Sequence, residues 1–157
     1  MEYTKGQLSW LVILRVLIGW HFLYEGLAKL FNANWSSVGF LLDSGGFLRS
    51  FFVGLASNPK TLEIVDFLNV WGLIAIGLGL MLGLFSRVAI WSGIALMSLY
   101  YLSHPPFIGI KYAMPTEGSY MIVNKILIEL SALLVLLVFP TSKKIGLDRL
   151  IFRAKKN

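Results

Sequence analysis

The stretch RVLIGWHFLYEGLAKL, residues 15–30, sets ionisable side chains into an otherwise apolar run. Three of them stand four residues apart: His21, Glu25 and Lys29. Because four residues make about one helical turn, these side chains share one face of a helix. Lys125 and Glu129 repeat the spacing near the other end of the chain. Ionisable groups are expensive at membrane depth, so we expect these residues to mark a functional site.

The composition of the chain indicates an integral membrane protein. Its 157 residues are 57% hydrophobic and 14% charged, and the mean hydropathy is +0.74. A soluble domain would carry about 25% charged residues. The formal net charge is +6, and the basic residues concentrate near the C-terminus beside an apolar segment. We therefore expect them to contact the anionic headgroups of membrane lipids, and we expect no nucleic acid as a partner.

The chain has no cysteine, which narrows its chemistry. Disulfides, thiolate nucleophiles and iron–sulfur ligation are excluded. Electron transfer would therefore need a bound organic cofactor or a partner subunit. We expect no metal, because there are only two histidines and no H-x-x-x-H or paired-carboxylate spacing. We expect no haem either, because His21 and His104 fall at different depths.

Four apolar segments approach the ~20 residues that a helix needs to cross a bilayer. They cover about residues 8–31, 62–85, 87–103 and 120–139. We predict an all-α integral membrane protein, a four-transmembrane-helix bundle that forms a single domain over residues 1–157, with a basic cytoplasmic tail at 140–157. The first segment is too long and too charged for a cleavable signal. Only a short turn separates the second and third segments, which predicts a tight antiparallel hairpin.

Four spans place both termini on one side of the membrane. The terminal side carries eight basic residues: Lys5, Arg87, Lys143, Lys144, Arg149, Arg153, Lys155 and Lys156. The other side carries Arg49, Lys60 and Lys111, with Lys29 and Lys125 near its boundary. The positive-inside rule therefore predicts a multi-pass protein of the bacterial inner membrane with both termini in the cytoplasm.

Two loops are expected on the outer side. The loop at residues 32–61 is rich in aromatic residues: Trp35, Phe40, Phe47, Phe51 and Phe52. We interpret it as one or two short helices on the outer membrane surface, and a packed lid with no ligand role is the alternative. The loop at residues 104–119 should be ordered but irregular, because it contains several proline and glycine residues.

Polar groups of all four segments converge in the outer half of the predicted bundle. They are His21, Glu25, Lys29, Glu63, Asp66, Asn69, His104, Asn124, Lys125 and Glu129. Apart from Arg15, the inner half is almost wholly apolar. Gly19 and Gly26 border the polar face of the first segment and could admit a neighbouring helix. For Gly79 and Gly83, which form a G-x-x-x-G pair, we expect packing within the bundle.

These side chains could form an outward-facing pocket for a quinone or a small anion. The expected catalytic residues are Glu25, Glu129 and His104, which could relay the protons that quinone reduction needs. Lys29, Lys125 and Arg49 could attract an anionic substrate. The remaining candidates for substrate binding are Asn124, Asp66, Asn69, His21 and Trp35.

A structural interpretation of the same residues stays open. Glu25 with Lys29, and Lys125 with Glu129, could form plain ion pairs. The two lysines could also extend to the headgroups, and His21 could simply bind a backbone carbonyl. The protein would then be a non-enzymatic membrane scaffold or a small permease. A lipid-modifying enzyme is the weakest hypothesis, because the acidic residues are too scattered to bind a diphosphate.

Five motifs in this order resemble the DoxX/DoxD family of small four-helix membrane proteins. They are RxxxGWHFLYEGLAKL at 15–30, NWSS at 34–37, YYLSHPP at 100–106, EGSY at 117–120 and NKxLIE at 124–129. The resemblance implies a redox-linked subunit of the thiosulfate:quinone oxidoreductase type, which oxidises thiosulfate to tetrathionate and reduces a membrane quinone. It also implies a separate DoxA-like partner subunit. The sequence leaves a homo-oligomer open.

Overall fold

The computed structural model describes residues 2–114 and 121–153, and every regular element in these ranges is a helix. In chain order the helices are α1 (Lys5–Leu30), α2 (Val38–Leu42), α3 (Arg49–Ser57), α4 (Pro59–Leu82), α5 (Ser86–Ser103), α6 (Lys125–Val138) and α7 (Asp148–Arg153). Among them, α1 and α4 are long and apolar enough to cross a membrane, by length and composition. The all-helical fold class is therefore confirmed.

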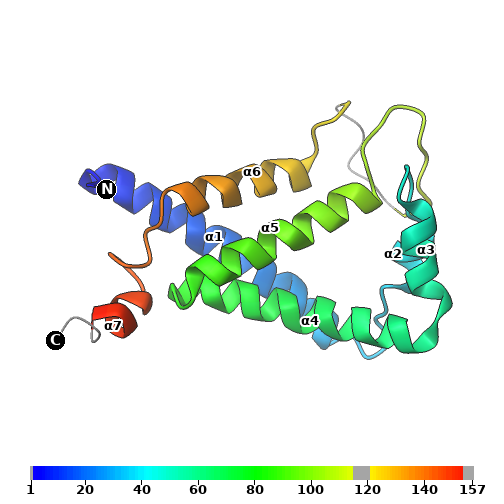
Figure 1. Cartoon of the computed structure of the whole chain (residues 1–157), viewed down its shortest axis with the longest axis horizontal. Helices are drawn as coiled ribbons and strands as arrows, with labels where there is room; N and C mark the ends of the chain where they lie inside the picture. The colour runs from blue at the N-terminus through cyan, green and yellow to red at the C-terminus, as the bar shows by residue number, and fades with distance from the viewer. Residues whose placement is uncertain (1, 115–120, 154–157) are drawn as a thin grey trace.

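The four longest helices run back and forth between two ends of the molecule (Figure 1). The N-terminus and α7 lie at one end, which we call the terminal end. Helices α2 and α3 lie at the other, which we call the loop end. The largest helix contact joins α1 to α4, and the next joins α5 to α6. The aromatic loop expected to hold one or two short helices contains two, α2 and α3.

Two of the expected spans are short helices in the structure. Helices α5 and α6 have 18 and 14 residues, which gives lengths of about 27 and 21 Å. The hydrocarbon core of a bilayer is about 30 Å thick. Helix α6 begins at Lys125 because the Asn124 side chain caps it and accepts a hydrogen bond from the Leu127 N–H at 2.9 Å. The EGSY motif at 117–120 lies outside the described residues.

Glycine lets the backbones of α1 and α4 approach each other closely. A Cβ atom on Gly77 would lie 2.5 Å from the Leu23 backbone nitrogen and 2.7 Å from the Gly19 carbonyl oxygen. A Cβ on Gly26 would lie 2.9 Å from the backbone nitrogen of Ile74. The expectation that Gly19 and Gly26 admit a neighbouring helix is confirmed, and that helix is α4.

Three residues, 83–85, join α4 to α5 in the expected tight hairpin. Gly83 ends α4 in the left-handed region with φ 64°, which suits glycine because it has no Cβ. Phe85 also has a positive φ, 46°. A Cβ on Gly79 would lie 2.9 Å from the Ala89 Cβ. The glycine pair Gly79 and Gly83 thus serves packing within the chain, as the sequence predicted.

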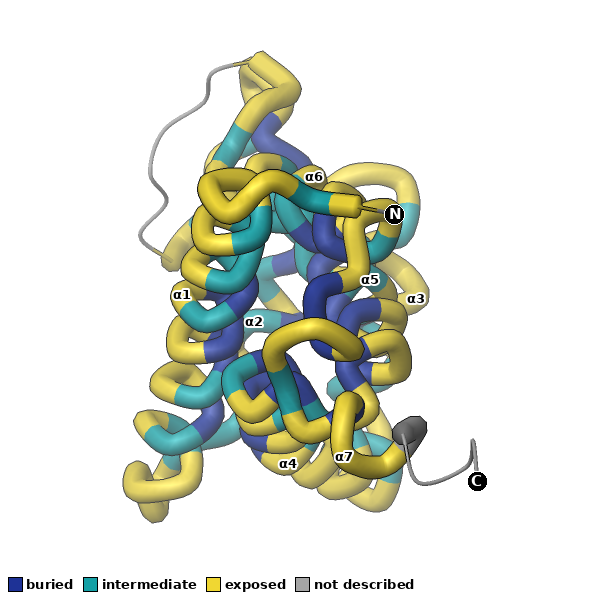
Figure 2. The backbone as a smooth tube through the Cα atoms, turned by 90° about the vertical axis from the view of Figure 1, so that its left-hand side faces the viewer, coloured by how far each residue is buried: buried dark blue, intermediate teal, exposed yellow. Residues whose placement is uncertain are grey.

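Apolar side chains fill the centre of the bundle and also cover its outside. The most buried large side chains come from α1, α4 and α6: Phe22, Leu80, Leu133 and Leu136. The buried positions follow the inward faces of these helices (Figure 2). The outward faces expose tryptophans at four positions: Trp10, Trp20, Trp71 and Trp91. An outward apolar face of this kind suits contact with lipid.

The residues after α6 fold back onto the terminal end. The Leu147 N–H donates to the Leu82 carbonyl at 3.0 Å, and the Asp148 N–H donates to the Gly83 carbonyl at 2.8 Å. The buried Thr141 hydroxyl accepts a hydrogen bond from the Arg15 guanidinium at 3.0 Å. Arg15, the polar residue that the sequence places in the apolar half, is therefore bonded to the segment after α6. Its partners come from a segment that, in the sequence, looks like a solvated tail.

Candidate functional site

A cavity of about 140 Å³ lies among α1, α4, α5 and α6, in the half of the bundle nearer the loop end. Its polar lining residues are His21, Glu25, Lys29, Tyr100, Lys125 and Glu129. Its apolar lining residues are Phe22, Leu73, Met97 and Ile126. Five of the eleven predicted site residues therefore meet at one cavity. Helical periodicity places the first three on one face of α1 and the last two on one face of α6. The packing of α1 beside α6 brings these two faces together.

The closest polar contact at the cavity joins α1 to α6. His21 Nδ1 lies 2.8 Å from Glu129 Oε1, a hydrogen bond when Nδ1 carries its proton. The His21 side chain is 47% exposed and the Glu129 side chain is 13% exposed. The imidazole therefore connects a largely buried carboxylate with the outside of the protein. His21 binds this carboxylate, and not a backbone carbonyl as the structural interpretation proposed.

Lys29 reaches across the bundle to α4 and α5. Its Nζ atom donates to Asn69 Oδ1 at 3.0 Å and to the Tyr100 hydroxyl at 3.5 Å. Asn69 Nδ2 donates to the same hydroxyl at 2.7 Å. The ammonium also lies 5.2 Å from the centre of the Trp35 ring, within cation–π range. Lys29 is therefore held inside the bundle, and its hydrogen bonds do not run along α1 to Glu25.

Three further predicted site residues lie away from the cavity lining. Asp66 accepts hydrogen bonds from the backbone N–H of Ser37, at 2.8 Å, and from its hydroxyl, so it anchors the start of α2 to α4. Asn124 caps α6, as described above. Arg49 is exposed at the first residue of α3. These contacts give Asp66 and Asn124 local structural roles.

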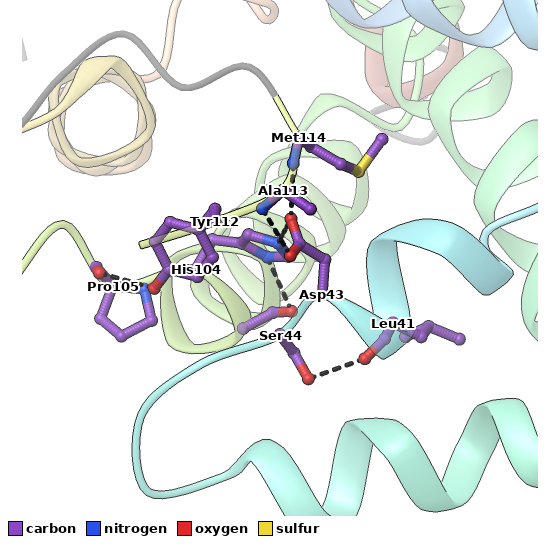
Figure 3. Close-up of polar contacts among 9 residues, drawn as sticks. Leu41, Asp43, Ser44, His104, Pro105, Tyr112, Ala113 and Met114 are labelled. Carbon is purple, nitrogen blue, oxygen red and sulfur yellow. Dashed lines mark hydrogen bonds and ion pairs between the residues drawn. The ribbon is translucent and has the colours of Figure 1, made fainter. Parts of the chain in front are cut away.

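His104 lies in a separate cluster above α5, at the loop end (Figure 3). Its ring stacks on Phe40 at a centroid distance of 4.0 Å and lies 4.7 Å from the Tyr112 ring. Its Nδ1 atom lies 3.0 Å from the Ser103 hydroxyl. Its buried Nε2 atom has no hydrogen-bond partner in the described part of the chain and lies 3.8 Å from Asp43 Oδ2. The structure does not bring His104 to the cavity that Glu25 and Glu129 line.

The charge states of this cluster follow from burial and hydrogen bonding. Burial lowers the pKa of His104, and the Asp43 carboxylate offsets this only in part. Burial alone would raise the pKa of Asp43. The backbone N–H groups of Ala113 and Met114, at 2.8 and 2.9 Å, and the nearby imidazole outweigh burial and hold the pKa of Asp43 below its usual value. At neutral pH a neutral imidazole therefore faces a charged carboxylate that pins the loop after α5.

Two residues of these clusters were not among the sequence candidates. Tyr100 accepts hydrogen bonds from both Lys29 and Asn69 and lines the cavity. The sequence offered one signal for Tyr100: it stands four residues before His104. On a predicted helix, this spacing puts Tyr100 on the same face as that candidate residue. Asp43 carried no signal, because its partners come from residues 104–114, far along the chain.

The lining of the cavity is balanced in charge. Two carboxylates, Glu25 and Glu129, face two ammonium groups, Lys29 and Lys125, and His21 adds a group that can carry or release a proton. In the described residues, no three His, Asp or Glu side chains lie close enough together to hold a metal ion. The cavity therefore offers hydrogen bonds and proton-transfer groups between apolar walls.

These features define an all-helical membrane protein with a small polar cavity near one end of a helix bundle. Residues 10–105 match the DoxX family, and the chain belongs to that family. The matched range runs from α1 to the end of α5 and includes the His21, Glu25 and Lys29 face, whereas α6 lies beyond it. Family membership, predicted from the motifs, is confirmed. Searches among curated proteins and among solved structures find no match for this chain.

Proposed function

We propose that this DoxX-family protein is a redox-linked subunit of the bacterial inner membrane whose cavity binds a quinone headgroup. The observation that carries the proposal is the convergence of six polar and four apolar side chains on one cavity. In this proposal α1, α4, α5 and α6 all span the bilayer, and the terminal end faces the cytoplasm. The position of the N-terminus and α7 at one end supports that topology (Figure 1).

The size and charge of the cavity favour a compact, neutral ligand group. Its volume of about 140 Å³ is below the ~300–1,000 Å³ of pockets that enclose whole drug-sized ligands. A quinone ring fits that scale if its isoprenoid chain lies outside, in the lipid. Because the carboxylates and ammonium groups balance, a neutral ring meets hydrogen-bond donors and no net charge. Phe22, Leu73 and Met97 supply the apolar surface for the ring.

Reduction of the ring needs two electrons and two protons. The hydrogen-bonded pair of His21 and Glu129 could deliver protons from the exposed imidazole to a ring oxygen. The electrons would come from a DoxA-like partner subunit that oxidises thiosulfate. The full reaction then balances as two thiosulfate ions, one quinone and two protons giving one tetrathionate ion and one quinol.

A small sulfur anion is the second candidate ligand for the same cavity. Lys29 and Lys125 supply two positive charges at its wall, and Lys29 is already held by Asn69 and aromatic rings. The charge of Glu25 and Glu129 opposes an anion unless one carboxyl is protonated. This opposition is the reason that we rank the anion second.

A non-enzymatic scaffold is the third candidate function. The observation that favours it is the mutual hydrogen bonding of Lys29, Asn69 and Tyr100, because a structural network of this kind needs no ligand. A scaffold would keep its assembly when the proton-handling pair is altered, whereas a quinone site would lose turnover.

Quinone content and turnover test the leading proposal. The full chain would be purified in mild detergent, alone and with any co-purifying subunits, and extracted for bound quinone. Thiosulfate-dependent reduction of a short-chain quinone would then be followed in both preparations. We expect bound quinone in both and turnover in the one that retains the partner. Absence of bound quinone together with absence of turnover in either preparation would refute the proposal.

A further inference from the structure

A second and larger cavity, of about 680 Å³, opens at the terminal end. It lies between the start of α5, the end of α6 and the segment that folds back after α6. Four basic side chains from separate parts of the chain line it: Arg15, Arg87, Lys143 and Lys144. Of the described residues, Asp148 is the acidic one in its lining. The charges of these lining residues therefore sum to an excess of three positive charges, four cations against one carboxylate.

The carboxylate of Asp148 is already engaged by the backbone. Its Oδ1 accepts a hydrogen bond from the Phe85 N–H at 2.7 Å, and its Oδ2 accepts one from the Ser86 N–H at 3.2 Å. An acidic side chain at this place stabilises the positive end of the α5 dipole. Asp148 therefore cannot fold outward to neutralise the basic residues at the cavity mouth without uncapping α5.

Two buried polar atoms at this cavity have no hydrogen-bond partner among the described residues. Arg15 is 3% exposed, and its two terminal nitrogens donate to Thr141 Oγ1 and to the Ile145 carbonyl. Its Nε atom makes no hydrogen bond, and neither does Oγ of Ser86, a residue that is also 3% exposed. Buried polar groups are nearly always paired. With small shifts of their side chains, Arg15 and Ser86 could bind a polar group of a ligand in the adjoining cavity.

The walls of the cavity are apolar and come from the two helices that flank it. The lining includes Val88 and Ile90 of α5 and Leu136, Leu137 and Val138 of α6. The basic residues and the apolar walls thus belong to one cavity. A site with basic residues on one side and apolar walls on the other suits a ligand that carries a phosphate group at one end and a hydrocarbon chain at the other.

We infer that the terminal-end cavity is a binding site for one anionic phospholipid, with its phosphate at the basic residues and one acyl chain along the α5 and α6 walls. A free phosphate ion shares the headgroup chemistry but would leave the apolar walls uncovered. A zwitterionic lipid would bring its own positive charge to a site with an excess of positive charge. The inference is independent of the cavity near the loop end.

Native mass spectrometry of the full chain in detergent tests the inference. The protein would be titrated with phosphatidylglycerol, phosphatidylcholine or inorganic phosphate, and the retained adducts would be counted. The test variant is the double substitution Arg87→Gln with Lys144→Gln, because both residues are exposed and line the cavity. The matched control is Arg49→Gln with Lys60→Gln, which removes the same charge from exposed positions at the other end.

We expect one phosphatidylglycerol per wild-type chain, retained in an excess of phosphatidylcholine. One basic residue near an anionic lipid is worth about fivefold in affinity, so the test variant should bind phosphatidylglycerol about 25-fold more weakly. The control variant should bind like the wild type. Equal loss in both variants, or no loss in either, would overturn the site. Retention of inorganic phosphate with no preference for phosphatidylglycerol would overturn the assignment to a lipid. The melting temperature of each variant, measured without lipid, checks that it is folded.

Discussion

Nδ1 of His21 lies 2.8 Å from Oε1 of Glu129, and this contact joins α1 to α6 across the cavity. The contact between these two helices is otherwise much smaller than the contact between α1 and α4. The hydrogen bond fixes the direction in which the Glu129 carboxylate points. A substitution that keeps the shape of this side chain can therefore test its proton-handling role.

The substitution Glu129→Gln should reduce turnover while leaving the fold intact. The amide keeps the shape of the carboxylate and cannot carry a proton, so the rate of quinone reduction should fall about 100-fold or more. The amide oxygen can still accept the hydrogen bond from the half-exposed imidazole, so the unfolding free energy should fall by less than about 1 kcal/mol. Turnover and thermal unfolding would be measured on the same preparation. The control is Glu63→Gln, an exposed carboxylate of α4 outside the cavity lining, and equal turnover in the two variants would contradict the assigned role.

The substitution Gly77→Ala should separate α1 from α4. The added methyl group would lie 2.5 Å from the Leu23 backbone nitrogen, and backbone atoms cannot move aside without shifting the helix. We expect a loss of about 1–3 kcal/mol in unfolding free energy, the usual range for overpacking. Thermal unfolding in detergent measures it.

The control for this change lies on the same helix. A Cβ on Gly72 would meet no heavy atom within 4 Å, so Gly72→Ala should gain about 0.5–1 kcal/mol from the better helix propensity of alanine. If both substitutions shift the melting temperature in the same direction, the close approach at Gly77 does not limit packing.

The sequence predicted which residues share a face of one helix. It missed the contacts that depend on how several helices are rotated against one another. Helical periodicity was enough to place Glu25 and Lys29 on one face, because this needs only the turn length. It could not show that Lys29 bonds Asn69 and Tyr100, because those partners depend on how far α4 and α5 are turned. Asp148 was missed for a different reason. Asp148 reaches the start of α5 only because the chain folds back after Pro140. In the sequence, the charged segment after this proline looks like a solvated tail.

Removal of Asn69 should expose the dependence of Lys29 on its partners. Asn69→Ala leaves the ammonium without its 3.0 Å acceptor and the Tyr100 hydroxyl without its 2.7 Å donor. Loss of a hydrogen bond to a charged group should lower the unfolding free energy by about 1.5–3 kcal/mol. Adding Lys29→Met should restore part of that loss, because the unsatisfied charge is gone. A double-mutant cycle by chemical unfolding gives the coupling. The control pair is Asn69→Ala with Lys5→Met, and it should be additive within about 0.5 kcal/mol, because Lys5 begins α1 at the end opposite to Lys29.

The His104 cluster should make the loop end sensitive to mild acid. Because burial lowers the folded-state pKa of His104 below its usual value, the neutral ring contributes stability that is present above the unfolded pKa of about 6.5 and is lost as the pH falls through the folded pKa. Asp43 follows the same direction at a lower pH, because its folded-state pKa is also lowered. The melting temperature should therefore fall between pH 7.5 and 5.

The variant His104→Phe isolates this effect. The phenyl ring can keep the stacking on Phe40 and Tyr112 but cannot take up a proton. The difference in melting temperature between pH 7.5 and 5 should be smaller in this variant than in the wild type. An unchanged difference would show that groups other than His104 dominate the acid response.

Asp148→Asn should release the segment that folds back on the terminal end. The amide has one acceptor oxygen in place of two, and it loses the negative charge that complements the start of α5. We expect docking of the segment to weaken by about 1–2 kcal/mol, within the range for partly buried charges at a helix end. Limited trypsin cleavage after the exposed Lys143 and Lys144 measures the docking, since cleavage needs the segment to open. Glu63→Gln, which removes a carboxylate far from this segment, should leave cleavage unchanged. Equal rates in Asp148→Asn and the wild type would mean that the hydrogen bond from the Leu147 N–H to the Leu82 carbonyl holds the segment instead.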